Sequence, residues 1–488
     1  MGGIGLTATS SGAQETSKNV LSGVNVQTAP VHVGNAEFEE LTPEESVNIT
    51  AAVFFDGTAN NRENTNIRLE YEKMKRGEPH NEELVKKYRD FWWGTPWNPN
   101  KTGSYDNDHS NISRIEPAYE PVDEEKVKKF SVYIEGIGTE NEGSDSKIGM
   151  GLGTGSTGVR AKVKKGCEEV SNVIADMGVT DINILSIETY GFSRGAAAAR
   201  NFIHEITQRK GQIKEIITTG SGEYAPVSTT IIYYDVDYGA LGEFLEQKGI
   251  KVKMIVIHFA GLFDTVASLG LAHGNNTAQL KLNAVKKSQH TLQLAAGDEH
   301  RSNFRLTDIN STGNRGVEKF LPGVHSDIGG GYVHNADEEL RLDYTLTNLN
   351  DLRAERDFLI EQGWYKPKEI TVSDFWGTLT GHRKGLSNRY SYIPLQIMAK
   401  FSKDKGVNFI LSKVTRSYPI TSELSATKAI LDEYVFNDDV EMSYNNPEHR
   451  ILLKTLRNRY FHFSAHYSSI GMGPNRVHGN RQRVTQAG

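Results

Sequence analysis

A pentapeptide near the middle of the chain has the residue types and spacing of a nucleophilic site. Gly-Phe-Ser-Arg-Gly at 191–195 follows the apolar, β-branched run 182–190 and precedes alanines at 196–199. A strand that turns through Gly-x-Ser-x-Gly into a helix holds its serine in a strained turn, with the hydroxyl above the sheet. The glycines allow neighbouring backbone to approach closely. The pattern therefore predicts that Ser193 is the nucleophile of an acyl-transfer reaction.

Such a serine needs a histidine base and a carboxylate that orients the base, and both are expected after later strands. Asp264 follows the strongly apolar run 251–262, and His325 follows the run 317–324 and precedes the glycine triplet 329–331. We therefore expect Asp264 to orient His325, which we place in a loop. A helix-capping role for Asp264 and an ordinary packed histidine are the alternatives. Asp327 is a rival acid, although its position suits shaping the loop better.

The reaction also needs N–H donors for the oxyanion that forms on the attacked carbonyl. One is expected from the backbone of Arg194, and the second from Gly57 or Thr58, which follow the strand predicted over 49–56. Asp56 is predicted to orient this loop. Alternatively, it binds a cation together with Asn60 and Asn61.

Predicted strands alternate with predicted helices along the sequence. This alternation predicts an α/β fold with a mostly parallel sheet and helices on both faces. We expect a flexible leader over 1–48, a catalytic domain with insertions over 49–335, and a C-terminal cap or accessory region of mixed helix and loop over 336–488. Strands are predicted over 49–56, 129–136, 182–190, 251–262 and 317–324, with a weaker one, in a hairpin or insertion, over 229–235. Helices are predicted over 82–90, 159–177, 195–209, 241–248 and 348–362.

Composition excludes several classes of protein. The formal net charge of −6 and the lack of a basic tract argue against nucleic-acid binding. The single cysteine, Cys167, rules out an intrachain disulfide and a cysteine-rich metal site. No cofactor or metal is expected, and the glycine pattern at 153–158 lacks the preceding strand of a dinucleotide site. With no visible signal peptide or membrane-spanning run, we expect a protein made in the cytoplasm.

Four segments in this order resemble a known family. They are Phe-Phe-Asp-Gly-Thr at 54–58, Gly-Phe-Ser-Arg-Gly at 191–195, Gly-Leu-Phe-Asp-Thr-Val at 261–266, and Pro-Gly-Val-His-Ser-Asp-Ile-Gly-Gly-Gly-Tyr at 322–332. Together they resemble the α/β-hydrolase domain of the first group of type VI secretion lipase effectors, over roughly residues 49–335. The segment 457–467 also looks like the family's C-terminal end.

The resemblance implies a catalytic triad of Ser193, Asp264 and His325, the residues chosen above from their order. It implies phospholipase A activity, A1 or A2, on a phospholipid membrane. It also implies delivery into a rival cell's periplasm by a type VI spike or tube component, with a cognate immunity protein in the producer. Two alternatives stay open: a carboxylesterase or thioesterase for soluble esters, and a non-catalytic secretion-associated binding module on a hydrolase scaffold.

Overall fold

The computed structural model describes residues 47–93, 103–143, 145–146, 155–219, 228–267, 277–345, 347–469, 471–477 and 479–488. The first strand begins at Val47, so the leader predicted over 1–48 lies almost entirely outside the described residues. The glycine pattern at 153–158 falls only partly within them, and its last member, Gly158, precedes a helix.

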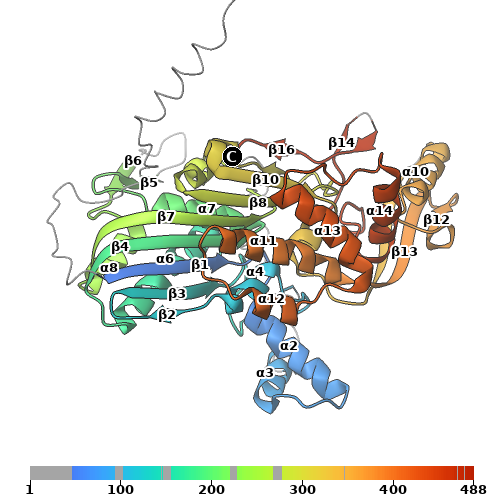
Figure 1. Cartoon of the computed structure of the whole chain (residues 1–488). Helices are drawn as coiled ribbons and strands as arrows, with labels where there is room; N and C mark the ends of the chain where they lie inside the picture. The colour runs from blue at the N-terminus through green and yellow to red at the C-terminus, as the bar shows by residue number, and fades with distance from the viewer. Residues whose placement is uncertain are drawn as a thin grey trace, which may run out of the picture.

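A seven-stranded sheet forms the centre of the molecule (Figure 1). Its strands are β1 (Val47–Phe55), β2 (Val122–Asp123), β3 (Val127–Ile134), β4 (Asp181–Phe192), β7 (Lys251–Phe263), β8 (His290–Ala296) and β10 (Gly316–Leu321). The spatial order is β10-β8-β7-β4-β1-β3-β2, and all neighbours are parallel except β2, which is antiparallel to β3. The mostly parallel α/β fold predicted from the sequence is therefore confirmed, although β8 was not predicted.

Both faces of this sheet are buried, which explains why its strands are almost continuously apolar. In β1 the side chains alternate between two hydrophobic cores, with Val53 and Phe55 in one and Phe54 in the other. The helices packed in the core of Val53 are α6 (Val159–Asp176), α7 (Arg194–Glu205) and α8 (Gly239–Gln247). Those packed in the core of Phe54 are α4 (Asn111–Ile115), α9 (His325–Gly329), α10 (Leu349–Glu361), α11 (Tyr392–Asp404), α12 (Leu411–Ser417), α13 (Ser422–Phe436) and α14 (Pro447–Arg459).

The chain beyond residue 335 is not the mixed helix and loop that the sequence suggested, because it contains a second sheet. This sheet is antiparallel, in the order β11-β13-β12, and α10 (Leu349–Glu361) packs beside it. Its strands are β11 (Ala336–Tyr344), β12 (Ile370–Ser373) and β13 (Thr378–Leu386). Helices α11, α12 and α13 lie in front of the central sheet in Figure 1, so the late part of the chain completes the core of the early part. The division near residue 335 stays a prediction.

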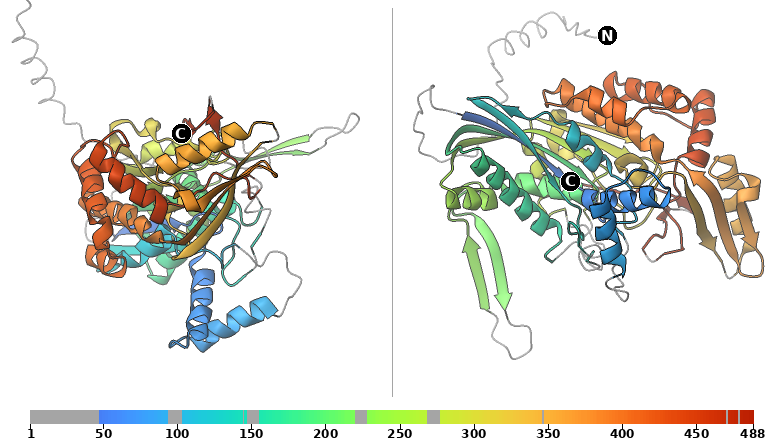
Figure 2. Two further views of the ribbon diagram at one scale, coloured as in Figure 1. Left: turned by 90° about the vertical axis from the view of Figure 1, so that its right-hand side faces the viewer. Right: turned by 90° about the horizontal axis from the view of Figure 1, so that it is seen from below.

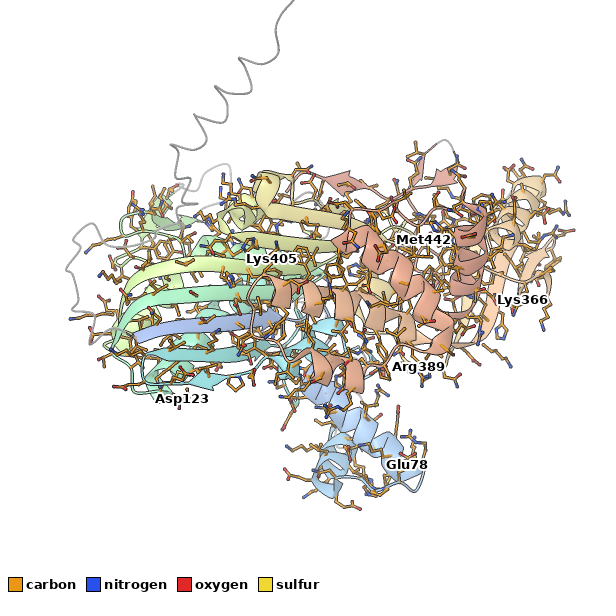
Figure 3. The ribbon with its side chains drawn as sticks, in the orientation of Figure 1. Glu78, Asp123, Lys366, Arg389, Lys405 and Met442 are labelled. Atoms are coloured by element: carbon orange, nitrogen blue, oxygen red, sulfur yellow. The ribbon has the colours of Figure 1, made fainter. Side chains whose placement is uncertain are left out.

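Several short elements lie outside these layers. Helices α2 (Arg62–Lys75) and α3 (Glu82–Trp93) form one projection, and the hairpin of β5 (Ile213–Thr219) and β6 (Ser228–Tyr233) forms another (Figure 2). Two short pairings join later segments: β14 (Arg476–Val477) with β15 (Asn480–Arg481), and β16 (Thr485–Gln486) with β9 (Leu306–Thr307). Among the exposed charged residues, Glu78 and Lys366 lie at the periphery of the view in Figure 3, and Lys405 lies over its middle. No helix among the described residues is long and apolar enough to cross a membrane.

Candidate active site

Ser193 occupies a strained turn between β4 and α7. Its backbone has φ 59° and ψ −126°, in the region that residues with a Cβ rarely adopt. Its N–H donates to the Phe263 carbonyl at 3.0 Å, which ties the turn to the end of β7. A Cβ on Gly191 would lie 2.4 Å from the Gly195 carbonyl oxygen, and one on Gly195 would lie 2.3 Å from the Asp56 carbonyl oxygen. The spacing of the two glycines is therefore a packing requirement of this turn.

Asp264 and His325 lie together at the carboxyl edge of the sheet. His325 Nδ1 lies 2.5 Å from Asp264 Oδ2, and both side chains are buried. The other carboxylate oxygen of Asp264 accepts the N–H of Ala296, at the end of β8, at 2.9 Å. Asp264 has φ 45°, so its backbone is strained as well. His325 begins the short helix α9, so the predicted loop position was wrong. Helix geometry here directs the imidazole towards the end of β7.

The surroundings of this pair set its charge. Burial alone would raise the pKa of Asp264, but Arg483, which donates to Asp264 Oδ1 at 2.9 Å, and the His325 hydrogen bond outweigh it and lower the pKa. Burial lowers the pKa of His325, and the hydrogen bond to Asp264 offsets part of that effect. The arrangement favours an ionised carboxylate beside a neutral imidazole at neutral pH.

The loop after β1 is held by Asp56. This carboxylate accepts the Gly57 N–H at 2.7 Å, the Ser110 hydroxyl at 2.5 Å and the Tyr133 hydroxyl at 2.6 Å. The Gly57 N–H already donates to Asp56. The better candidate for the second oxyanion donor is therefore Thr58, which lines the cavity described next. Asn61 Oδ1 caps α2, which leaves the alternative of a cation shared with Asp56 without support.

A cavity of about 820 Å³ brings the candidate residues together. Ser193, Arg194, His325 and Thr58 line it, together with apolar side chains such as Phe304. The His325 ring packs against Phe192, with centroids 4.7 Å apart, and against Phe304, at 5.0 Å. Ser193 and His325 both belong to the described residues, and their side chains make no hydrogen bond to each other. Proton transfer between them needs a small closure of the kind that substrate binding often causes.

Comparison with known proteins places this geometry in a family. The family described as "T6SS, Phospholipase effector Tle1-like, catalytic domain" matches residues 94–351, just over half of the chain. The chain belongs to this Tle1-like family. It therefore carries a phospholipase effector domain of the type VI secretion system, and the coarse prediction of a lipolytic hydrolase is confirmed. No curated protein matches the chain significantly.

Solved structures support the fold of the Tle1-like domain. The chain is similar to the structure titled "Structure of the Tle1 effector bound to the VgrG spike from the Type 6 secretion system", with a TM-score of 0.57 and 20% identity, covering 94% of this chain and 99% of that chain. A structure of an uncharacterized protein from Pseudomonas aeruginosa matches at a TM-score of 0.38 and 18% identity, covering 80% of this chain and 51% of that one. At this identity the first match shows a shared fold.

A second histidine of the cavity lining, His462, is also paired with a buried carboxylate. Asp327, the rival acid, does not bond His325. Its Oδ1 lies 3.0 Å from His462 Nδ1, and its Oδ2 accepts the Val324 N–H at 3.0 Å. His462 also stacks on Tyr332, with ring centroids 3.7 Å apart. Asp327 thus joins the turn that carries His325 to the segment of His462, and the loop-shaping role that the sequence suggested for it stays a prediction.

Sequence reasoning missed residues that support the pair of Asp264 and His325. Arg483 approaches from 219 positions away, in a polar segment without any periodic pattern. Glu299 accepts the His325 N–H at 3.3 Å and forms a two-point ion pair with Arg301. Burial alone would raise the pKa of Glu299, but Arg301 lowers it far below its usual range. His462 was detectable only through the segment 457–467, which resembles the family's end.

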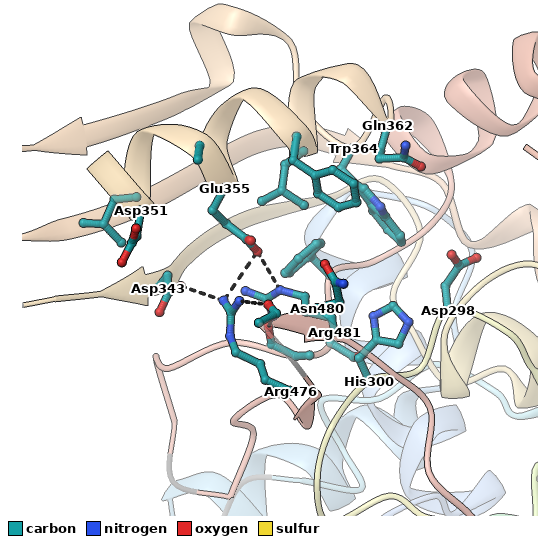
Figure 4. Close-up of a pocket in the computed structure, with 18 of the residues that line it drawn as sticks. Asp298, His300, Asp343, Asp351, Glu355, Gln362, Trp364, Arg476, Asn480 and Arg481 are labelled. Carbon is teal, nitrogen blue, oxygen red and sulfur yellow. Dashed lines mark hydrogen bonds and ion pairs between the residues drawn. The ribbon is translucent and has the colours of Figure 1, made fainter. Parts of the chain in front are cut away.

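A second cavity, of about 660 Å³, is lined by residues of α10, of the late segments and by Val324, which directly precedes His325 (Figure 4). Its arginines are already paired: Arg476 with Asp343, Arg481 with Glu355, and Arg457 with Asp298. Figure 4 shows Arg476 and Arg481 bridged by the carboxylate of Glu355. Neither Ser193 nor His325 lines this cavity. These ion pairs compensate the charges of the arginines named and join the small sheet and α10 to the late segments.

Proposed function

We propose that the chain is a serine phospholipase A that hydrolyses acyl esters of glycerophospholipids. The observation that carries the proposal is that His325, hydrogen-bonded to the buried Asp264, lines the same cavity as the strained Ser193. Membership of the Tle1-like phospholipase effector family supports a lipid ester as the substrate. Positional preference on the glycerol, A1 or A2, is left open by the proposal.

In this mechanism Ser193 Oγ attacks the ester carbonyl while His325 accepts the hydroxyl proton. Asp264 accepts the Nδ1 hydrogen bond, which fixes the histidine tautomer and stabilises the imidazolium. The backbone N–H groups of Arg194 and Thr58 donate to the oxyanion. Both are available for this, because neither donates a hydrogen bond to any of the described residues. His325 then protonates the departing lysophospholipid oxygen, and a water that His325 deprotonates releases the fatty acid from Ser193.

We further propose that the protein acts as an antibacterial effector in the periplasm of a target cell. The similar solved structure contains a Tle1 effector bound to the VgrG spike, which supports a spike component as the carrier. A cognate immunity protein in the producing cell belongs to the same proposal. Pull-down of the full chain with spike proteins from the same genome tests whether a spike component carries it. If none of these proteins binds, the proposed carrier is contradicted.

Fatty-acid release from phospholipid vesicles tests the catalytic proposal. Ser193→Ala is expected to lower the rate by about 10³-fold or more, because the nucleophile is removed. Ser412→Ala, at an exposed serine of α12, is the matched control and is expected to keep the wild-type rate. A serine-reactive fluorophosphonate is expected to label the wild type and not Ser193→Ala. Equal release by wild type and a folded Ser193→Ala protein contradicts the proposal.

A further inference from the structure

Arg194 is a cation without a partner in the candidate active site. Two arginines line the cavity, and Arg301 is neutralised by Glu299 at 2.8 Å. Arg194 forms no ion pair or side-chain hydrogen bond with any residue in the described ranges. It is partly exposed to the cavity, and burial lowers its pKa to about 10, so it stays protonated at neutral pH. An uncompensated charge at this depth destabilises the folded chain.

The position of Arg194 makes its charge costlier still. It is the first residue of α7, whose N-terminus carries a partial positive charge that repels a cation. The first turn of α7 contains no acidic residue that could offset either charge. Of the acids that line the cavity, Glu338 is paired with Arg383, and Asp337 is exposed at the rim. The guanidinium and the helix end therefore combine into a local positive potential beside Ser193.

Other polar atoms on the cavity wall are also unpaired. Asn60 Oδ1 and His462 Nε2 are buried without a hydrogen-bond partner among the described residues, in side chains that are only 5% and 7% exposed. The Thr58 hydroxyl is in the same state. Buried polar atoms are normally paired, so several unpaired atoms in the lining of one cavity indicate a polar ligand.

We propose that Arg194 binds the phosphodiester of the glycerophospholipid substrate. This rests on the proposed function, since it assumes that Ser193 attacks an acyl ester of that lipid. The phosphate of such a lipid is joined to the ester by the glycerol unit alone, so it must lie near the nucleophile when the ester reacts. The planar guanidinium offers two parallel N–H donors that match two phosphate oxygens. Arg194 thus contributes twice, with its backbone N–H to the oxyanion and its side chain to the phosphate.

The subsite predicts selectivity for phospholipid over neutral acylglycerol. The test compares kcat/KM on monomeric dihexanoyl phosphatidylcholine with that on dihexanoylglycerol and p-nitrophenyl butyrate. Arg194→Gln is expected to lower kcat/KM on the phospholipid by about 10- to 100-fold, the effect of losing charge-assisted hydrogen bonds. The loss on the two neutral esters, which have no phosphate, is expected to be at least about fivefold smaller than the loss on the phospholipid, because glutamine keeps the backbone N–H that serves the oxyanion. Arg194→Lys is expected to fall between wild type and Arg194→Gln, because the charge remains without the fork.

Arg305→Gln, at a nearby exposed arginine that does not line the cavity, is the control and should leave all three substrates unchanged. Fluorophosphonate labelling of Ser193 reports that the turn is intact in each variant. An equal loss on neutral and phosphorylated substrates, or no loss on either, overturns the subsite. If the wild type and Ser193→Ala hydrolyse these esters equally, the proposed function fails instead. Calorimetric binding of glycerophosphocholine to Ser193→Ala, with and without Arg194→Gln, then still decides the subsite: unchanged affinity contradicts it.

Discussion

The candidate active site contains two buried histidine–carboxylate pairs that differ in how their charges are compensated. The pair of His325 and Asp264 is separated by 2.5 Å, and Arg483 adds a positive charge on the far side of the carboxylate. The pair of His462 and Asp327 is separated by 3.0 Å, and burial raises the pKa of Asp327. The first carboxylate is therefore held in its ionised form, whereas burial favours the neutral form of the second.

Each pair is also attached to the fold in a different way. Asp264 follows β7 directly and accepts the N–H of Ala296 from the neighbouring strand, so the sheet itself positions it. Asp327 instead accepts backbone N–H groups from Val324 and His462, which join the turn after β10 to the segment after α14. A histidine beside a carboxylate is thus not enough to identify a base. The charge on the far side of the carboxylate and its attachment to the sheet are the features by which we propose Asp264 and His325 as the proton-transfer pair and Asp327 and His462 as a structural pair.

The largest expected effect comes from making the same substitution in both histidines. His325→Gln is expected to lower kcat/KM for phospholipid hydrolysis by about 10⁴-fold or more, because the general base is lost. His462→Gln is expected to cost less than about tenfold, because it removes a packing partner and one polar atom of the cavity lining but leaves the general base in place. Vesicle assays measure both rates, and circular dichroism checks that both variants fold. If kcat/KM falls as much in His462→Gln as in His325→Gln, the proposed distinction between a catalytic and a structural pair is contradicted.

A smaller effect is expected from removing the charge behind Asp264. Because burial lowers the pKa of His325, and only the neutral imidazole accepts a proton, the acid limb of kcat/KM in the wild type should lie below His325's usual value of about 6.5. Arg483→Met leaves the Asp264 charge uncompensated, which stabilises the His325 cation and raises its pKa. The limb is then expected to move to higher pH.

Full pH profiles of kcat/KM measure this shift, with Arg353→Met, an exposed arginine paired with Asp374, as the control. If the acid limb stays in place in Arg483→Met, or moves equally in the control, Arg483 does not influence the pKa of His325.

The smallest effect on activity is expected at the structural carboxylate. Asp327→Asn is expected to keep kcat/KM within about threefold at neutral pH and to lower the free energy of unfolding by about 1–2 kcal/mol, the range for weakening a buried hydrogen-bond acceptor. Thermal unfolding followed by circular dichroism measures the change in the free energy of unfolding. A large loss of activity without loss of stability would instead give Asp327 a part in catalysis.

Local sequence patterns predicted the strand ends that carry Ser193, Asp264 and His325. Alternating apolar residues followed by glycine or a polar side chain are short-range signals, and they mark the carboxyl edge of a parallel sheet well. Strand β8 was missed because His-Thr-Leu-Gln-Leu-Ala-Ala at 290–296 is short and has few β-branched residues. The role of each catalytic candidate remains a prediction until the variants are assayed.

Long-range partners could not be predicted in the same way. Nothing in the residues around Arg483 indicates that it reaches Asp264, since that contact depends on the packing of the whole late segment against the sheet. The pairing of Asp327 with His462 has the same origin, because the two residues are separated by 135 positions. Such contacts follow from tertiary structure, and a single sequence carries no pattern for them.

The contact between Arg483 and Asp264 also bears on the order in which the protein folds. It closes a loop spanning 219 positions, and contacts of such long range form late because they require most of the chain to be ordered first. Until Arg483 arrives, the charge of Asp264 is uncompensated, which raises the pKa of His325 and leaves less of the neutral imidazole that accepts a proton. A partly folded chain, during synthesis or after passage through a secretion channel, would therefore hold Ser193 without a competent base. Hydrolytic activity should then be among the last properties that the refolding protein regains.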